Sequence, residues 1–229
     1  MNEQDKFVIE PIAYLRGDFK TPFAIPRQAG IAKDIISTIE FTGKYRNPDA
    51  IRGIEGFSHL YLIWQFSENV EKNKTFNATV RPPRLGGNKR VGVFASRAPF
   101  RPNSLGISIV KLIEVKETRD KGNILIVSGA DLMDGTPIFD IKPYLPEFDS
   151  IPEAKGGFTE DNPFRTYEVE VSKEAKNSIP EDKMAEIIQA LSNDARPAYH
   201  ENEDRVYGVN IAGIDIKFKI SKGKVVIVC

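Results

Sequence analysis

The feature that most constrains the fold is a series of short apolar, β-branched runs separated by glycine and proline. Runs of this kind are typical of strands, and the glycines and prolines between them are typical of turns. The expected strands cover residues 7–15, 35–41, 59–66, 91–96, 105–115 and 123–130. Because helical periodicity is scarce in this part of the chain, the sequence predicts a mainly β fold, either a barrel or a sandwich.

The chain changes character after residue 146. Residues 147–163 are polar, acidic and rich in Gly and Pro, and they predict a linker or surface excursion. The elements expected beyond it are a half-exposed strand over 165–172, an amphipathic helix over 180–191 and two or three strands over 206–228. We therefore expect two domains, a β domain over 1–150 and a small α+β domain over 151–229.

Composition disfavours several classes of protein. No apolar run reaches the roughly 18 residues of a membrane span, and the first residues lack the pattern of a signal peptide. The only cysteine is Cys229, which excludes an intramolecular disulfide and fits a cytoplasmic protein. With His59 and His200 as the only histidines, no metal site is expected.

The net charge is zero, but the charges are distributed unevenly along the chain. Residues 72–113 contain arginines and lysines but no Asp or Glu, whereas residues 131–161 are strongly acidic. An arginine-rich block predicts contacts with phosphate or RNA. The alternative is that the basic block pairs with the acidic block or simply faces solvent.

A turn rich in carboxylates follows the strand expected over 123–130. Asp131, Asp134 and Asp140 lie within ten residues of one another, around the turn formed by residues 134–137. Pro143 and Pro146 keep the following segment extended. This corner is a candidate active-site wall, and the alternative is a decorated hairpin turn.

The familiar nucleotide and hydrolase motifs are missing. No Gly-x-Gly-x-x-Gly follows a strand, and the chain has no Walker A sequence, no His-Glu-x-x-His and no Gly-x-Ser-x-Gly. A Rossmann site is therefore not indicated. Polar side chains instead lie on loops fixed by Pro and Gly.

Taken together, these loops closely resemble those of the TsaA/TrmO family of S-adenosylmethionine-dependent tRNA methyltransferases. The motifs that carry the resemblance are Pro26-Arg27-Gln28, Phe57-Ser58-His59-Leu60, Arg81 to Asn88, Gly92 to Ala95 with Arg97, Phe100 to Asn103, and Asp134 to Pro146. They span roughly residues 8 to 150. The downstream run from Asp194 to Tyr199 resembles a turn in the C-terminal domain of bacterial members.

The resemblance implies a β-barrel-like, non-Rossmann methyltransferase domain in a homodimer. It implies S-adenosyl-L-methionine as cofactor and the tRNA anticodon loop as partner. The implied reaction is methylation of N6 of the threonylcarbamoyl-modified adenosine on the 3′ side of the anticodon. The alternative is a non-catalytic RNA-binding module that uses the basic block, and titration with S-adenosylmethionine would separate the two.

The loop positions and the resemblance together predict the binding residues. The expected cofactor contacts are Gln28, His59, Leu60, Arg97, Ile107, Asp131, Leu132, Met133, Asp134, Gly135 and Thr136. The expected RNA contacts are Arg27, Arg81, Arg84, Lys89, Arg90, Arg101, Tyr144, Arg196 and Tyr199. For His59, the alternative is a satisfied core imidazole.

Two carboxylates are candidates for catalysis. The N6 of a threonylcarbamoylated adenine resembles a ureido nitrogen and is a poor nucleophile, so an acceptor for its proton would help. We predict Asp134 or Asp140 in this role, and Arg97 as the partner of the cofactor's carboxylate. Alternatively, one aspartate caps the turn and the other pairs with Lys142 or an arginine.

Overall fold

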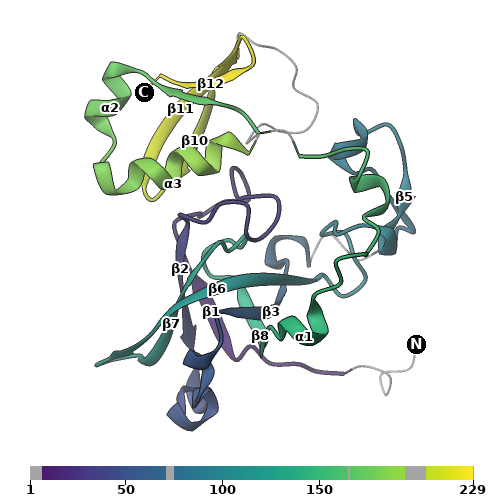
Figure 1. Ribbon diagram of the computed structural model, residues 1–229, viewed down its shortest axis with the longest axis vertical. Helices are drawn as coiled ribbons and strands as arrows, with labels where there is room; N and C mark the ends of the chain where they lie inside the picture. Colours follow the sequence, from purple (N-terminus) through teal and green to yellow (C-terminus); the bar gives the residue numbers. More distant parts are fainter. Residues whose placement is uncertain (1–6, 71–74, 165, 194–204, 229) are drawn as a thin grey trace.

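The computed structural model describes residues 7–70, 75–164, 166–193 and 205–228. Its first half forms a six-stranded antiparallel sheet of order β1-β2-β7-β6-β3-β8, in which β8 also pairs with β1. The strands are β1 (Ala13–Arg16), β2 (Ile36–Phe41), β3 (His59–Gln65), β6 (Leu105–Thr118), β7 (Gly122–Ser128) and β8 (Pro137–Pro143). The sheet closes through only two residue pairs between β1 and β8, so it is barrel-like and irregular (Figure 1). The mainly β prediction is confirmed.

Alternation along the strands creates the interior of this sheet. In β3, Leu60, Leu62 and Trp64 are buried, while His59 and Tyr61 point outward, as the period of a strand requires. The inward side chains pack with apolar side chains from the other strands into one core. Burial of apolar side chains in this shared interior stabilises the strands of the sheet.

A glycine in β6 makes room for the single tryptophan. Gly106 lies opposite Trp64 in the β3–β6 pairing, and a Cβ atom built on Gly106 would lie 2.5 Å from the indole ring. Real Cβ contacts are essentially never so short. Gly106 therefore allows the indole to lie flat against β6, where its Nε1 donates to Ser108 Oγ at 3.0 Å.

Three predicted strands are much shorter than expected. The strand predicted over 165–172 is limited to β9 (Val169–Val171). The strand predicted over 7–15 begins only at Ala13, beyond Pro11, which has no backbone N–H to donate to a ladder. The strand predicted over 91–96 is limited to β5 (Val91–Gly92), which pairs with β4 (Thr79–Val80). The buried Val93 still donates its N–H to Ala78 O, in register with this pairing, and the chain then turns in a 3-10 helix over Val93–Ala95.

The second half forms the expected α+β unit. Its sheet has the order β10-β11-β12-β9, with β12 and β9 parallel. The elements are β9 (Val169–Val171), α2 (Lys173–Ser178), α3 (Glu181–Ser192), β10 (Tyr207–Ile211), β11 (Ile214–Ser221) and β12 (Lys224–Ile227). Helix α3 lies against this sheet (Figure 1). Within the described residues, no helix is long and apolar enough to cross a membrane.

The long loop between β1 and β2 belongs to the second core. Phe19, Ala24, Ala32 and Ile35 are buried in the same apolar cluster as α3 and the sheet of the second unit. Figure 1 shows this loop rising from the barrel-like sheet toward α3. The second unit therefore supports a loop of the first one. The expected division at residue 150 stays a prediction.

Polar contacts reinforce the same junction. Lys183 of α3 pairs with Asp18, and also with Glu186 at 3.1 Å. Ala212 N donates to Asp18 O at 3.0 Å, and Gln189 of α3 accepts a hydrogen bond from Asp34 N at 2.8 Å. These contacts hold both ends of the β1–β2 loop against the second unit.

Candidate functional site

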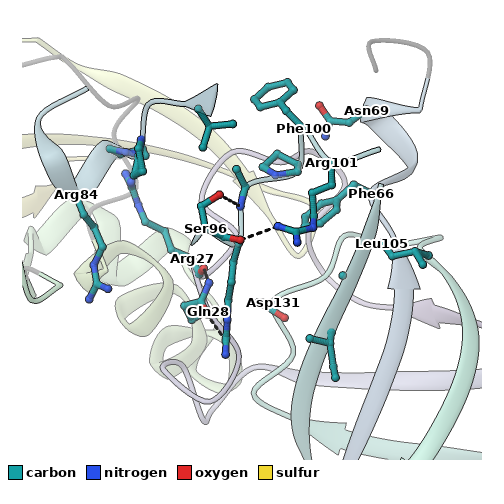
Figure 2. A pocket seen from close by; sticks show the side chains of 18 of the residues that line it. Arg27, Gln28, Phe66, Asn69, Arg84, Ser96, Phe100, Arg101, Leu105 and Asp131 are labelled. Atoms are coloured by element: carbon teal, nitrogen blue, oxygen red, sulfur yellow. Dashed lines mark hydrogen bonds between the residues drawn. The ribbon is translucent and has the colours of Figure 1, made fainter. Parts of the chain in front are cut away.

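A broad cleft of about 1920 Å³ opens beside the barrel-like sheet. One wall comes from the β1–β2 loop, from the end of β3 and from the start of β6. The other parts come from residues 77–101, the turn that follows β7 and residues 155–164. The cleft is thus assembled from segments far apart in the sequence, and side chains from several of them face it in Figure 2.

Asp131 supplies a carboxylate to this cleft from the turn after β7. Its Oδ1 accepts a hydrogen bond from Ser108 Oγ at 2.5 Å, and Ser108 in turn accepts from Trp64. Burial raises the pKa of Asp131 above its ordinary value of 3.8. The hydrogen bonds from Ser108 and from the backbone N–H groups of Asp131 and Ala29, with the charge of Arg97, oppose this rise without cancelling it.

An amide and a guanidinium lie beside Asp131 in the cleft. Arg97 Nη1 donates to Gln28 Oε1 at 2.8 Å, and Gln28 Nε2 donates to the carbonyl of Arg27 at 2.6 Å. Both ends of the Gln28 amide are therefore fixed. In Figure 2 the side chains of Gln28 and Asp131 lie close together, on two different segments of the chain. The site thus offers a negative group and a positive group within one hollow.

Most of the predicted cofactor residues lie in this cleft. Those that line it are Gln28, Arg97, Ile107, Asp131, Leu132, Met133 and Thr136. Four others do not line it: His59, Leu60, Asp134 and Gly135. Leu60 is fully buried inside the sheet, and the His59 ring lies 6.3 Å from the Tyr144 ring, with Nδ1 2.9 Å from Ser58 Oγ. For these four residues, cofactor contact stays a prediction.

Asp134 has contacts that belong to the frame of the site. Its Oδ1 accepts from Gly17 N at 3.2 Å, and its Oδ2 pairs with Lys20 Nζ at 2.7 Å. Burial raises the pKa of Asp134, but these hydrogen bonds and the charges of Lys20 and Arg16 outweigh it, so the net shift is downward. Asp134 therefore pins the turn to the start of the β1–β2 loop.

Asp140 lies on β8 and also has local partners. Its Oδ1 accepts from Ile141 N at 2.9 Å, and its Oδ2 lies 3.3 Å from Lys142 Nζ. This is the pairing expected if the residue has no role in catalysis. Neither Asp134 nor Asp140 lines the cleft, so the geometry does not support either as proton acceptor, and their catalytic role stays a prediction.

The arginines predicted to contact RNA cluster around the cleft. Those that line it are Arg27, Arg81, Arg84, Arg90 and Arg101, whereas Lys89 and Tyr144 do not. Arg84 has its guanidinium 3.5 Å from the centre of the Phe164 ring, and Arg101 Nη1 donates to the carbonyl of Ser96 at 2.6 Å. Arg196 and Tyr199 lie outside the described residues.

Sequence reasoning missed two parts of the site. The segment 147–163, expected to be a linker, contributes Lys155 to Thr159 to the cleft, and Phe164, directly after it, lines the cleft as well. The phenylalanines in and next to this largely polar stretch, Phe148, Phe158 and Phe164, were the signal that it packs. Ser108 was also missed, although a serine in an apolar strand is itself a signal, because a buried hydroxyl needs a partner.

The fold and the cleft define the class of protein to which this chain belongs. The protein combines a barrel-like β domain, whose cleft holds a half-buried carboxylate and several arginines, with a small α+β unit. In the described part of the chain, no group of three metal-ligating side chains comes together. The sequence model of the family of tRNA-methyltransferase O N-terminal domains matches residues 14–150. The sequence model of the TrmO C-terminal domain matches residues 165–229. The chain therefore belongs to the tRNA-methyltransferase O family.

Individual relatives agree over almost the whole length. The tRNA (adenine(37)-N6)-methyltransferase of Escherichia coli K12 is 37% identical over 223 residues, 94% of each chain. A Pseudomonas aeruginosa protein, named provisionally as an S-adenosylmethionine-dependent methyltransferase, is 40% identical over 91% of this chain and 90% of its own length. The crystal structure of TrmO from P. aeruginosa superposes with a TM-score of 0.76 at 30% identity, covering 97% of this chain and 98% of that one.

Proposed function

We propose that this protein transfers a methyl group from S-adenosylmethionine to N6 of adenosine 37 in tRNA, with the threonylcarbamoyl-modified adenosine as its preferred substrate. The observation that carries the proposal is the cleft, which is lined by Asp131, Gln28 and Arg97 and by several further arginines. The family and the named relatives support the same reaction. Transfer of a labelled methyl group to tRNA tests it, and its absence at saturating cofactor and tRNA would contradict it.

The lining of the cleft fits the cofactor chemically. S-adenosylmethionine supplies an activated methyl group on a sulfonium cation and carries a carboxylate of its own. Asp131 would stabilise the cation, and Arg97, held by Gln28, would bind the carboxylate through a charge-assisted hydrogen bond. Leu132 and Met133 provide apolar surface beside these groups. The chain thus has a partner for each kind of group in the ligand.

Alignment and charge placement would then drive the transfer. Holding the adenine N6 in line with the methyl group converts a bimolecular step into an effectively unimolecular one. Of the carboxylates that line the cleft, Asp131 and Glu68, we assign acceptance of the N6 proton to Asp131, because its Oδ1 is oriented by Ser108. Asp134 and Asp140 remain predicted acceptors of the same proton, and mutation of each residue tests this prediction.

The tRNA would approach over the arginine-lined rim of the cleft. Arg81 and Arg90 are exposed there, in a region without acidic residues. Phosphate contacts by such side chains release counterions, so affinity for tRNA should fall steeply with salt. The second unit would assist recognition of the anticodon loop, with Arg196 and Tyr199 as the proposed contacts. The reaction would take place in the cytoplasm.

We also propose that the chain forms a homodimer. The outer face of β6 exposes Ile107, Ile109 and Ile113, with exposed fractions of 53%, 37% and 49%, and the exposed Lys111 lies between the last two. Tyr61 and Ile63 of the neighbouring β3 lie opposite Ile109 and Ile107 on the same face. An apolar strip of this kind is typical of an interface. Sedimentation equilibrium decides between a dimer and a monomer.

A further inference from the structure

Three phenylalanines that the proposed chemistry does not use are exposed together at the rim of the cleft. Phe94 is 72% exposed, Phe76 is 60% exposed and Phe100 is 50% exposed. Phe94 and Phe100 line the cleft, and Figure 2 shows Phe100 at its outer edge. Large aromatic side chains usually bury most of their surface, so three exposed rings at one place indicate a binding surface.

The three rings lie close to one another. The rings of Phe76 and Phe94 are nearly parallel, with centroids 6.4 Å apart and planes inclined by 26°. Phe76 and Phe100 line one small depression together with Arg101. The rings therefore form a continuous aromatic surface, which we call the aromatic platform: Phe76, Phe94 and Phe100.

The turn that carries Phe94 is held by several hydrogen bonds. Val93, which precedes Phe94, is buried and donates its N–H to Ala78 O at 2.9 Å. Arg101 Nη1 donates to the carbonyl of Val93 at 3.2 Å and to that of Ser96 at 2.6 Å, so one guanidinium braces both ends of the turn that carries Phe94. An exposed ring on a rigid turn is preorganised, because binding need not order the chain.

The charge around the platform indicates the kind of ligand. Arg90 is exposed on the same stretch of chain, and residues 75–113 contain no acidic residue. Flat apolar rings next to cationic side chains match a single-stranded nucleic acid, whose bases stack on aromatic rings while its phosphates contact arginine. A purely apolar protein partner would not need the neighbouring arginines.

We infer that the aromatic platform stacks unpaired bases of the tRNA anticodon loop beside the target adenosine. This inference rests on the proposed function and adds a stacking site to the arginine contacts. Splaying a loop base onto the platform would offset part of the cost of unstacking the target nucleotide. The platform would thereby favour loops over duplex RNA, since paired bases do not present their faces.

The test measures binding of an RNA anticodon stem-loop, which does not require catalysis. Phe94→Ala and Phe76→Ala should each raise Kd roughly 5- to 150-fold, the range that loss of one base–aromatic stack gives. Phe94→Trp should keep Kd near that of the parent, because a ring remains. Phe148→Ala is the matched control, since Phe148 is 71% exposed on α1 (Pro146–Asp149) and does not line the cleft.

Two further measurements distinguish the loss of base stacking from other causes of a raised Kd. The slope of log Kd against log salt should stay the same in Phe94→Ala, because no phosphate contact is lost. The affinity of Phe76→Ala for S-adenosylmethionine, measured by calorimetry, should be unchanged, because Phe76 does not line the cleft. Unaltered stem-loop binding by both Phe→Ala variants overturns the platform, as does a shift from dimer to monomer in Phe94→Ala. If the parent protein binds the stem-loop but methylates no tRNA, the proposed function is contradicted. The comparison of stem-loop affinities between the parent and the variants still tests the aromatic platform in that case.

Discussion

The Asp131 carboxylate is oriented from behind by two side chains of the sheet interior. Trp64 donates to Ser108, and Ser108 donates to Asp131, so the indole and the hydroxyl form one hydrogen-bonded chain that ends in the cleft. Ser108 is only 3% exposed. A buried hydroxyl with both of its bonds satisfied fixes its partner better than an exposed one.

Ser108→Ala should move the acid side of the pH–rate profile. If transfer needs ionised Asp131, the rate falls as pH falls through its pKa. Burial already raises that pKa above 3.8, and the hydrogen bond from Ser108 opposes the rise. Without this bond the pKa rises further, so the acid limb moves to higher pH. Ser128→Ala, which removes another buried serine hydroxyl, should leave the profile in place. An unshifted profile in Ser108→Ala would remove Asp131 from the rate-determining ionisation.

Arg97→Ala tests whether the guanidinium in the cleft binds the carboxylate of the cofactor. Loss of a charge-assisted bond to the cofactor's carboxylate should weaken cofactor binding by about 1.5–3 kcal/mol. Calorimetric titration with S-adenosylmethionine gives this value directly. Lys142→Ala is a suitable control, because its ammonium pairs with Asp140 outside the cleft. Equal affinities for the parent and a folded Arg97→Ala would show that this guanidinium does not bind the ligand.

At the scale of elements, the turn after β7 and the β1–β2 loop are joined by Asp134. Asp134→Asn should lower stability at neutral pH by about 0.5–1 kcal/mol, since the ion pair with Lys20 is partly exposed. The folded-state pKa of Asp134 lies below 3.8, so its contribution is present above that pH and is lost as pH falls through the folded-state pKa. Melting curves of both proteins should therefore converge in acid. Near-normal methylation by Asp134→Asn would fit this structural role, and a large loss of rate with an unchanged melting temperature would support Asp134 as the proton acceptor.

The same elements show what the sequence could predict. Strand β3 and helix α3 were predictable because each must bury one face. The spacing of apolar residues along the sequence, every second residue in the strand and every third or fourth in the helix, shows which face that is. The turn at 134–137 was also predictable, but the direction of its aspartates was not. Asp134 points to Gly17 and Lys20, which are remote in sequence, and that contact depends on how the β1–β2 loop packs against α3. The wall formed by residues 155–164 was missed for the same reason.

At the scale of the whole molecule, the two cores and the cleft depend on one loop. Residues 17–35 leave the barrel-like sheet, bury Phe19 and Ile35 in the second core, and bring Gln28 to the cleft. The second unit therefore has a structural reason to accompany the first one. Its packing sets the position of Gln28 and, through Gln28, of Arg97.

The most direct test of the central claim is the identity of the nucleoside formed on tRNA. The protein is incubated with S-adenosylmethionine and with tRNA that carries threonylcarbamoyladenosine at position 37, and the tRNA is digested and analysed by mass spectrometry. We expect one additional methyl group on N6 of that nucleoside, and little product on tRNA without the threonylcarbamoyl group. Methylation at a different nucleoside, or none while the cofactor binds, would contradict the account.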